Sequence, residues 1–238
     1  MKVDAIIFDK DGTLIDFDAF WVAVSVKALQ DVLKKVERED IPVFAFLTAL
    51  GVKDGVTDVD SVLCKGTYKQ IGEIVHGILK ENGCDCDVAE VEKFVLDGYN
   101  QNAEAGEVQP TCPDLKETLT ALKNRNIKLA VVTTDNERIT RTCLTKLGVI
   151  DLFDAIYTDD GKTPTKPDPF CALDFCRAFG VAKENAVMVG DTLTDVKFAR
   201  NAGIAVIGLA KNAHNKSLLV PQADVVVEKI SDLLSVLD

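Results

Sequence analysis

Short apolar runs recur along this chain with a spacing that fixes its fold class. Each run is three to six residues long and rich in β-branched side chains, which is typical of strands buried on both faces of a sheet. From residue 114 onward, helix-length segments lie between the runs. Strands that alternate with helices in this way form a parallel sheet covered by helices. The predicted strands span residues 3–8, 129–133, 155–157, 186–189, 205–208 and 225–227.

The intervening segments have helical periodicity, and glycines follow three of them at positions 148, 180 and 203, where a helix commonly ends. The predicted fold class is therefore α/β, with a doubly wound, Rossmann-like parallel sheet as its core. The predicted helices of this core span residues 115–124, 138–147, 169–179 and 194–202.

The alternation of strands and helices is interrupted after the first strand. Roughly ninety residues with mostly helical periodicity pass before the next strand begins. Gly106, Pro110 and Pro113 mark the return to the core in a helix-breaking stretch. We therefore expect an inserted α-helical domain at residues 17–105 and an α/β core at residues 1–16 and 106–238. The predicted helices of the insertion span residues 19–35, 43–50, 68–81 and 88–102.

Composition narrows the classes of partner. The net charge of −11 disfavours a nucleic acid or an anionic membrane surface, because their phosphates would be repelled. Charges interrupt every apolar run before the length of about 18 residues that a membrane helix needs. Seven cysteines without paired spacing fit a reducing compartment, so we expect a cytoplasmic protein. A small anionic substrate would need a metal ion and a nearby cation to offset the acidic surroundings.

The first strand ends in two carboxylates, Asp9 and Asp11, at the edge where α/β folds place their sites. Asp9 can face a metal and a substrate. Asp11 can offer its main-chain carbonyl to the metal and its carboxyl to a leaving group, and Gly12 permits the bend that follows. The alternative interpretation is a polar turn, since Lys-Asp-Gly is a common turn sequence.

Three further strand ends carry polar side chains. Thr133 can donate to a phosphoryl oxygen, although capping the next helix is the commoner role of a threonine there. Lys166, before Pro167, supplies a cation, although single lysines are usually solvated. Asp191 and Asp195 lie at the start of a helix and suit Mg²⁺, which prefers hard oxygen ligands. The alternative interpretation is that one aspartate caps the helix and the other lies at the surface.

Taken in order, these motifs resemble the haloacid dehalogenase superfamily. Its pattern is Asp-x-Asp-x-Thr, then Thr or Ser after the second strand, then Lys, then Gly-Asp with a further Asp. The insertion resembles, in position and helicity, the C1 cap of the subgroup of phosphoglycolate phosphatase and β-phosphoglucomutase. The matching residues are Asp9, Asp11, Thr13, Thr133, Lys166, Gly190, Asp191 and Asp195.

The resemblance implies a Mg²⁺-dependent phosphatase that hydrolyses a small phosphomonoester through an aspartyl-phosphate on Asp9. Asp11 would act as acid and then base. It also implies the remaining assignments: metal ligands Asp9, Asp191 and the Asp11 carbonyl; phosphoryl binding by Thr133, Lys166 and the Thr134 amide; and support of the metal from Asp195.

Several alternatives remain open at this point. A phosphomutase would share every core residue, and a non-catalytic phosphate-binding sensor would share the fold. A dehalogenase would lack the Asp11 carboxylate, and a phosphonatase would need a cap lysine, for which Lys53 and Lys65 are the candidates. The resemblance implies a monomer. We expect residues 51–60 and 65–67 of the insertion to select a small phosphorylated metabolite.

Overall fold

The computed structural model describes residues 2–237 and divides the chain into two compact units. One unit consists of Met1–Asp16 and Val108–Asp238, and the other of Phe17–Glu107. The second boundary lies two residues beyond the predicted one, because α5 (Val88–Ala105) continues to Ala105 and Gly106 donates its amide to the Asn102 carbonyl at 2.8 Å.

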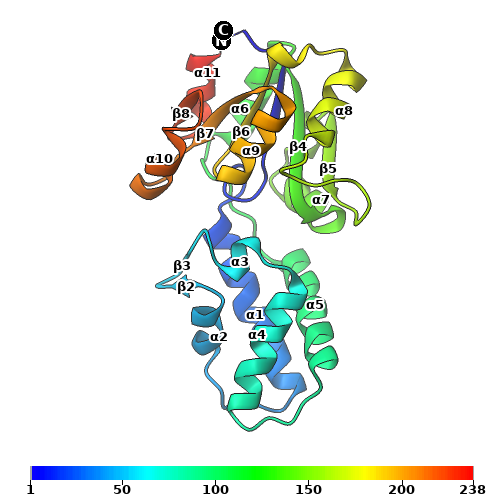
Figure 1. The fold of residues 1–238 in the computed structure, drawn as a ribbon, viewed down its shortest axis with the longest axis vertical. Helices are drawn as coiled ribbons and strands as arrows, with labels where there is room; N and C mark the ends of the chain where they lie inside the picture. The colour runs from blue at the N-terminus through cyan, green and yellow to red at the C-terminus, as the bar shows by residue number, and fades with distance from the viewer. Residues whose placement is uncertain (1, 238) are drawn as a thin grey trace. The chain divides into compact units, whose positions relative to one another are not determined.

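The first unit is built on a six-stranded parallel sheet with the strand order β5-β4-β1-β6-β7-β8 (Figure 1). All six predicted strands are present, and the α/β fold class is confirmed. Strand β1 lies in the middle of the sheet, with β4 on one side and β6 on the other. The strands that follow β1 in the chain are added on one side up to β5 and then on the other side from β6. Sheets of this kind place their ligand sites where the order switches sides. The bounds are β1 Ala5–Phe8, β4 Lys128–Asn136, β5 Ala155–Asp159, β6 Ala186–Gly190, β7 Ala205–Leu209 and β8 Val225–Val227.

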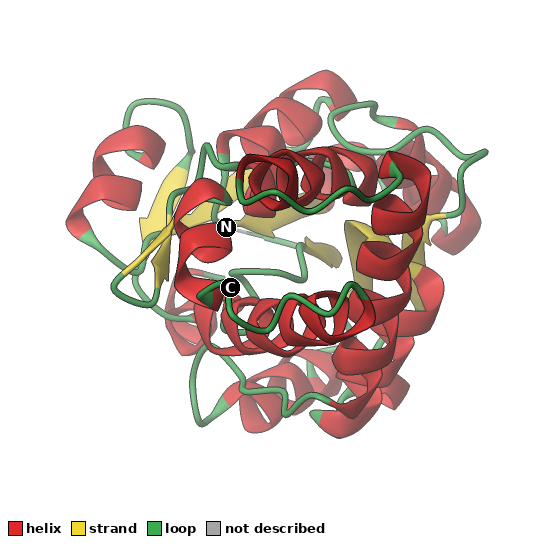
Figure 2. Cartoon of the chain, turned by 90° about the horizontal axis from the view of Figure 1, so that it is seen from below, coloured by secondary structure: helices red, strands yellow, loops and turns green. Residues whose placement is uncertain are grey.

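Both faces of this sheet are buried. Ala5 and Ile7 of β1 belong to the apolar cluster formed with helices α8 and α9, while Ile6 and Phe8, which point to the opposite face, are fully buried as well. Helices supply most of the regular structure outside the sheet (Figure 2). The helices of this unit are α6 Leu115–Asn124, α7 Glu137–Lys146, α8 Phe170–Phe179, α9 Leu193–Ala202, α10 Ala213–Leu219 and α11 Leu233–Val236.

The second unit is mainly helical, as expected. Helix α5 packs along both α1 and α4, which run lengthwise beside it in Figure 1. A π-helical turn at Asp18–Val22 precedes α1. The predicted helix at 19–35 is therefore two continuous segments of different pitch. The other bounds are α1 Ala23–Lys35, α2 Val43–Ala49, α3 Val62–Lys65 and α4 Tyr68–Glu81.

One element of this unit escaped the sequence analysis. A two-stranded hairpin, β2 (Val52–Lys53) and β3 (Val56–Thr57), lies within residues 51–60, where the sequence analysis predicted no strand. Asp54 and Gly55 form its two-residue loop, both with positive φ (52° and 78°), as hairpin loops of this length require. The Asp-Gly pair between two valines is the signal that could have identified it.

Candidate active site

The loop after β1 brings Asp9 to the carboxyl edge of the sheet. Its amide donates to the Val189 carbonyl of β6 at 2.9 Å, so the ladder between the two strands continues one residue past β1. Gly12 then takes a φ of +85°, and a Cβ built there would lie 2.2 Å from Asp191 Oδ2. Only glycine therefore fits this position, and the turn presses against the Asp191 carboxylate.

Asp191 follows the last residue of β6, and its Oδ1 accepts a hydrogen bond from the buried Thr13 hydroxyl at 3.0 Å. Removal from water and the nearby Asp195 carboxylate raise the pKa of Asp191 to about 7. The positive charges of Lys211 and Lys166 oppose this rise only in part.

Asp195 takes part in the cap of helix α9 and also pairs with Lys166 in the site. With Thr192 it forms a capping box at the start of α9, in which its Oδ2 accepts from the Thr192 amide at 3.0 Å and from the Thr192 hydroxyl at 2.7 Å. Its other oxygen accepts from Lys166 Nζ at 2.7 Å. Thr192 is thus the capping residue here, and Asp195 is 1% exposed rather than a surface aspartate.

Lys166 lies between two carboxylates inside the protein. Its Nζ donates to Asp9 Oδ1 at 2.5 Å as well as to Asp195, and all three side chains are buried. Burial disfavours its charge, but the Asp195 and Asp9 carboxylates outweigh burial and raise the pKa of Lys166 above its ordinary value. Burial raises the pKa of Asp9 well above its ordinary value, and Lys166 opposes that rise only in part.

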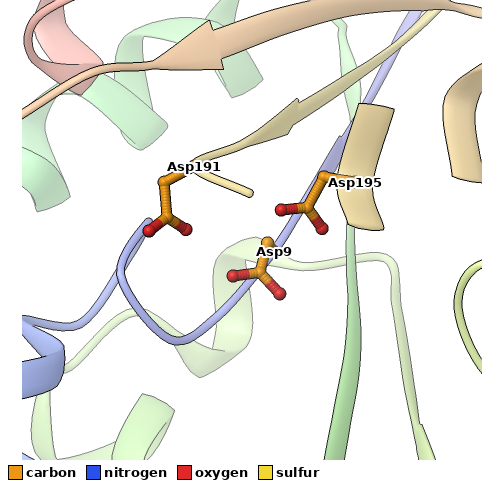
Figure 3. A group of neighbouring side chains, drawn as sticks. All are labelled: Asp9, Asp191 and Asp195. Carbon is orange, nitrogen blue, oxygen red and sulfur yellow. The ribbon is translucent and has the colours of Figure 1, made fainter. Parts of the chain in front are cut away.

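The three aspartates Asp9, Asp191 and Asp195 lie together on three different segments of the core (Figure 3). One oxygen from each lies within 4.8 Å of the others. Both oxygens of Asp195 already accept hydrogen bonds, whereas Asp9 and Asp191 each have one oxygen that accepts none from any residue between 2 and 237. Hard carboxylate oxygens in this arrangement fit Mg²⁺, with Asp9 and Asp191 as the better placed ligands.

Thr133 belongs to β4, two residues beyond Val131, the β4 partner of Phe8, and so lies at the same edge as Asp9. It is 4% exposed, and its hydroxyl accepts from the Asp135 amide at 3.2 Å. It does not cap the next helix, because Asn136 does so through its bond from the Ile139 amide at 3.0 Å. Thr134 is exposed at the strand end.

Lys166 lies in the segment that leads into α8. The Lys166–Pro167 peptide is cis, and Pro169 is the residue preceding the first turn of α8. Asp168 still accepts from the Phe170 amide at 2.9 Å. In the helical unit, Lys53 and Lys65 are both exposed, and Lys65 pairs with Asp60.

Sequence reasoning missed Lys10, which we had treated only as part of a turn. Its side chain is completely buried, and its ammonium pairs with Asp11 and with Asp135. A lysine two residues past a fully apolar central strand was the available signal, since such a position is seldom solvated. Its partner Asp135, 125 residues away, had no signal in the sequence.

Comparisons with known proteins identify the family of the chain. The family model for haloacid dehalogenase-like hydrolases matches residues 3–203. The pyrophosphatase PpaX of Bacillus velezensis is 30% identical over 99% of this chain and 96% of its own. The phosphoglycolate phosphatase of Psychrobacter arcticus is 28% identical over 88% of this chain and 84% of its own. The crystal structure of a putative β-phosphoglucomutase from Thermotoga maritima shares the fold, with a TM-score of 0.71 at 23% identity and 98% coverage of both chains.

The fold and the acidic site define a phosphohydrolase. The chain belongs to the haloacid dehalogenase-like hydrolase family, and its sequence is similar to phosphoglycolate phosphatases and a pyrophosphatase of that family. Within residues 2–237, no helix combines the length and the apolar character that crossing a membrane requires.

Proposed function

We propose that this protein is a Mg²⁺-dependent phosphatase that hydrolyses a small-molecule phosphomonoester through an aspartyl-phosphate on Asp9. The observation that carries the proposal is the position of Asp9, which is buried at the end of the central strand, bonded to Lys166 and grouped with Asp191. A carboxylate held in this way is a preorganised nucleophile. The names of the phosphoglycolate phosphatase and pyrophosphatase relatives support the substrate class.

Charge at the site supports the metal. Five carboxylates surround it, against the three ammonium groups of Lys10, Lys166 and Lys211, so the site has an excess of negative charge that must repel a phosphate. We propose that Asp9, Asp191 and the main-chain carbonyl of Asp11 hold Mg²⁺, and that Asp195 orients Lys166 instead of binding the ion. When bound, Mg²⁺ neutralises charge on the phosphoryl oxygens.

Each side chain of the site has its own role in the proposed reaction. An Asp9 oxygen attacks phosphorus and the bond to the leaving oxygen breaks, while Asp11 gives that oxygen a proton. Asp11 then takes a proton from the water that attacks the aspartyl-phosphate, which releases phosphate and restores the Asp9 carboxylate. Lys166, the Thr133 hydroxyl and the Thr134 amide hold the phosphoryl oxygens in both steps.

The helical unit at residues 17–107 is proposed to act as the cap that selects the substrate. The comparisons name both a carboxylate-bearing ester and pyrophosphate as substrates of relatives, so both belong in the test. We propose a cytoplasmic location, because all seven cysteines are free thiols. We also propose a monomer, which size-exclusion chromatography with light scattering would test.

The test is phosphate release from a panel of phosphoglycolate, pyrophosphate, sugar phosphates and aryl phosphates, with and without EDTA. We expect release that stops with EDTA and in Asp9→Asn, and a phosphate label on Asp9 after acid quench. Conversion of a hexose 1-phosphate into its 6-phosphate without release would instead indicate a mutase. Tight phosphate binding with no turnover of any substrate would indicate a sensor.

A further inference from the structure

Lys10 is the most unusual buried group that this mechanism does not use. Its side chain has no exposure to solvent, although lysine is among the residues least often buried. Its Nζ lies 3.0 Å from Asp11 Oδ1, 2.8 Å from Asp11 Oδ2 and 2.7 Å from Asp135 Oδ2. Burial alone would lower the pKa of Lys10, but the two carboxylates more than offset burial and raise it. The lysine therefore stays charged inside the protein.

This ion pair joins two segments that are far apart in the sequence. Asp11 lies in the loop after β1, whereas Asp135 lies near the end of β4, 125 residues from Lys10. The register between β4 and β5 shifts between Val132 and Asn136, so regular strand pairing does not hold this segment in place. The contact with Lys10 supplies a fixed point at that irregular end.

Asp135 in turn contacts the segment proposed to bind phosphate. Its amide donates to the Thr133 hydroxyl at 3.2 Å, and its Oδ1 accepts from the amide of Asn136, the residue that caps α7. A continuous set of bonds thus runs from Asp11 through Lys10 and Asp135 to Thr133. It links the proposed acid to the proposed phosphate-binding hydroxyl.

We propose that Lys10 is a positioning residue for the reaction: it holds the Asp11 carboxyl and, through Asp135, sets its place relative to the phosphoryl group bound at Thr133. The proposal rests on the function proposed above. A side chain that donates a proton to a leaving group gains most from such fixing, because proton transfer requires a short and aligned approach.

A purely structural role would have a different signature. If Lys10 only neutralised buried carboxylates, its loss would weaken turnover of all substrates alike. If it positions the acid, its loss must penalise substrates whose leaving group needs a proton. Phenyl phosphate and p-nitrophenyl phosphate form a matched pair, since the rings are similar while phenolate is a far more basic leaving group than p-nitrophenolate.

The experiment measures kcat/KM for both esters, because this ratio covers the steps up to phosphorylation of the enzyme. In Lys10→Met we expect kcat/KM for phenyl phosphate to fall about tenfold more than for p-nitrophenyl phosphate. Asp11→Asn should show the same preference or a larger one, and the double variant Lys10→Met with Asp11→Asn should show no further preference. Equal losses on the two esters in Lys10→Met would overturn the proposal.

Two controls keep the test decisive. Lys123→Met removes another lysine that pairs with an aspartate, Asp154 at 2.6 Å, and should leave the preference between the esters unchanged. If Lys10→Met does not fold, the double variant Lys10→Met with Asp135→Asn is measured instead, because it also removes the Asp135 carboxylate that would be left without its lysine partner. A wild-type protein that releases no phosphate would refute the proposed function itself, whereas an active wild type with equal losses refutes only the role of Lys10.

Discussion

The two units of this protein bury different kinds of side chain. Among residues 2–237, every buried aspartate and lysine lies in the α/β unit, at the carboxyl edge of its sheet: Asp9, Lys10, Lys166 and Asp195. In the helical unit, the buried polar groups are uncharged, and the best example is the hydroxyl of Tyr99 bonded to Ser25 at 2.8 Å. Burying charge is costly unless it is paired, so the α/β unit bears that cost at its proposed active site. The helical unit buries no charged side chain among the residues that the structure describes.

The largest expected effect lies at the nucleophile. Asp9→Asn keeps the size of the side chain but cannot form the aspartyl-phosphate, so phosphate release should fall by roughly 10⁴-fold or more. Steady-state assays at saturating substrate would measure this, with circular dichroism to verify the fold. Residual turnover within tenfold of wild type would show that the buried charges of the α/β unit are not the chemical centre.

A glycine in each unit provides a matched comparison. Gly12 and Gly83 have similar positive φ values of +85° and +78°, but a Cβ on Gly12 would collide with Asp191, whereas one on Gly83 meets nothing within 4 Å. Gly12→Ala should therefore lower kcat/KM by about 100-fold through displacement of the Asp191 carboxylate. Gly83→Ala should cost only about 1 kcal/mol of unfolding free energy and leave kcat/KM unchanged. Similar losses of kcat/KM in Gly12→Ala and Gly83→Ala would refute the effect expected from the contact between position 12 and Asp191.

The buried carboxyls also predict how pH acts on the metal-free protein. Because the folded-state pKa of Asp191 is raised to about 7 from an ordinary 3.8, its contribution favours folding at acidic pH and is lost as pH rises through about 7. Asp9 acts in the same direction. Mg²⁺ binds the ionised carboxylates, so it should raise the melting temperature by roughly 5 °C at pH 7.5 and much less at pH 5.

Differential scanning calorimetry at the two pH values, with EDTA or Mg²⁺, measures this difference. Asp191→Asn is the control, because an amide does not titrate and should weaken both the pH dependence and the response to Mg²⁺. An equal shift at pH 5 and 7.5 would contradict the assignment of the metal to these carboxylates.

The smallest effect is expected in the helical unit. Tyr99→Phe removes the hydroxyl that donates to Ser25, and Ser25 still donates to the Trp21 carbonyl at 2.7 Å. The unfolding free energy should fall by about 1 kcal/mol, as for one buried neutral hydrogen bond. Urea unfolding would measure it, and kcat/KM on aryl phosphates should not change. A kinetic effect larger than the loss of stability would mean that this unit does more than pack.

The sequence predicted the sheet and its polar edge because both depend on local patterns. Short continuous apolar runs define the strands, and Asp9, Thr133 and Asp191 were identifiable since each lies at the end of such a run or within two residues of it. The contact between Lys166 and Asp195 was not predictable in the same way. It depends on how the segment before α8 approaches the first turn of α9, and no periodicity in the sequence indicates that.

The sequence analysis missed other features for different reasons. The hairpin at β2 and β3 has strands of two residues each, too short for a periodicity to be visible, although its Asp54-Gly55 loop was readable. The pairing of Lys10 with Asp135 joins positions 125 residues apart. Roles such as those of Asp11 and Thr134 stay predictions, because geometry alone does not measure proton transfer or phosphate binding.

The central position of β1 also has a consequence for the order of synthesis on the ribosome. Residues 5–8 emerge first, but their two neighbours in the sheet begin only at Lys128 and Ala186. The whole helical unit is therefore translated before β1 has a neighbouring strand with which to pair. Contacts this distant in sequence form slowly, since a long loop must close first. Until residue 128 has been translated, the strand that ends at Phe8 is an exposed apolar segment, and a nascent chain stalled before that residue should bind chaperones through it.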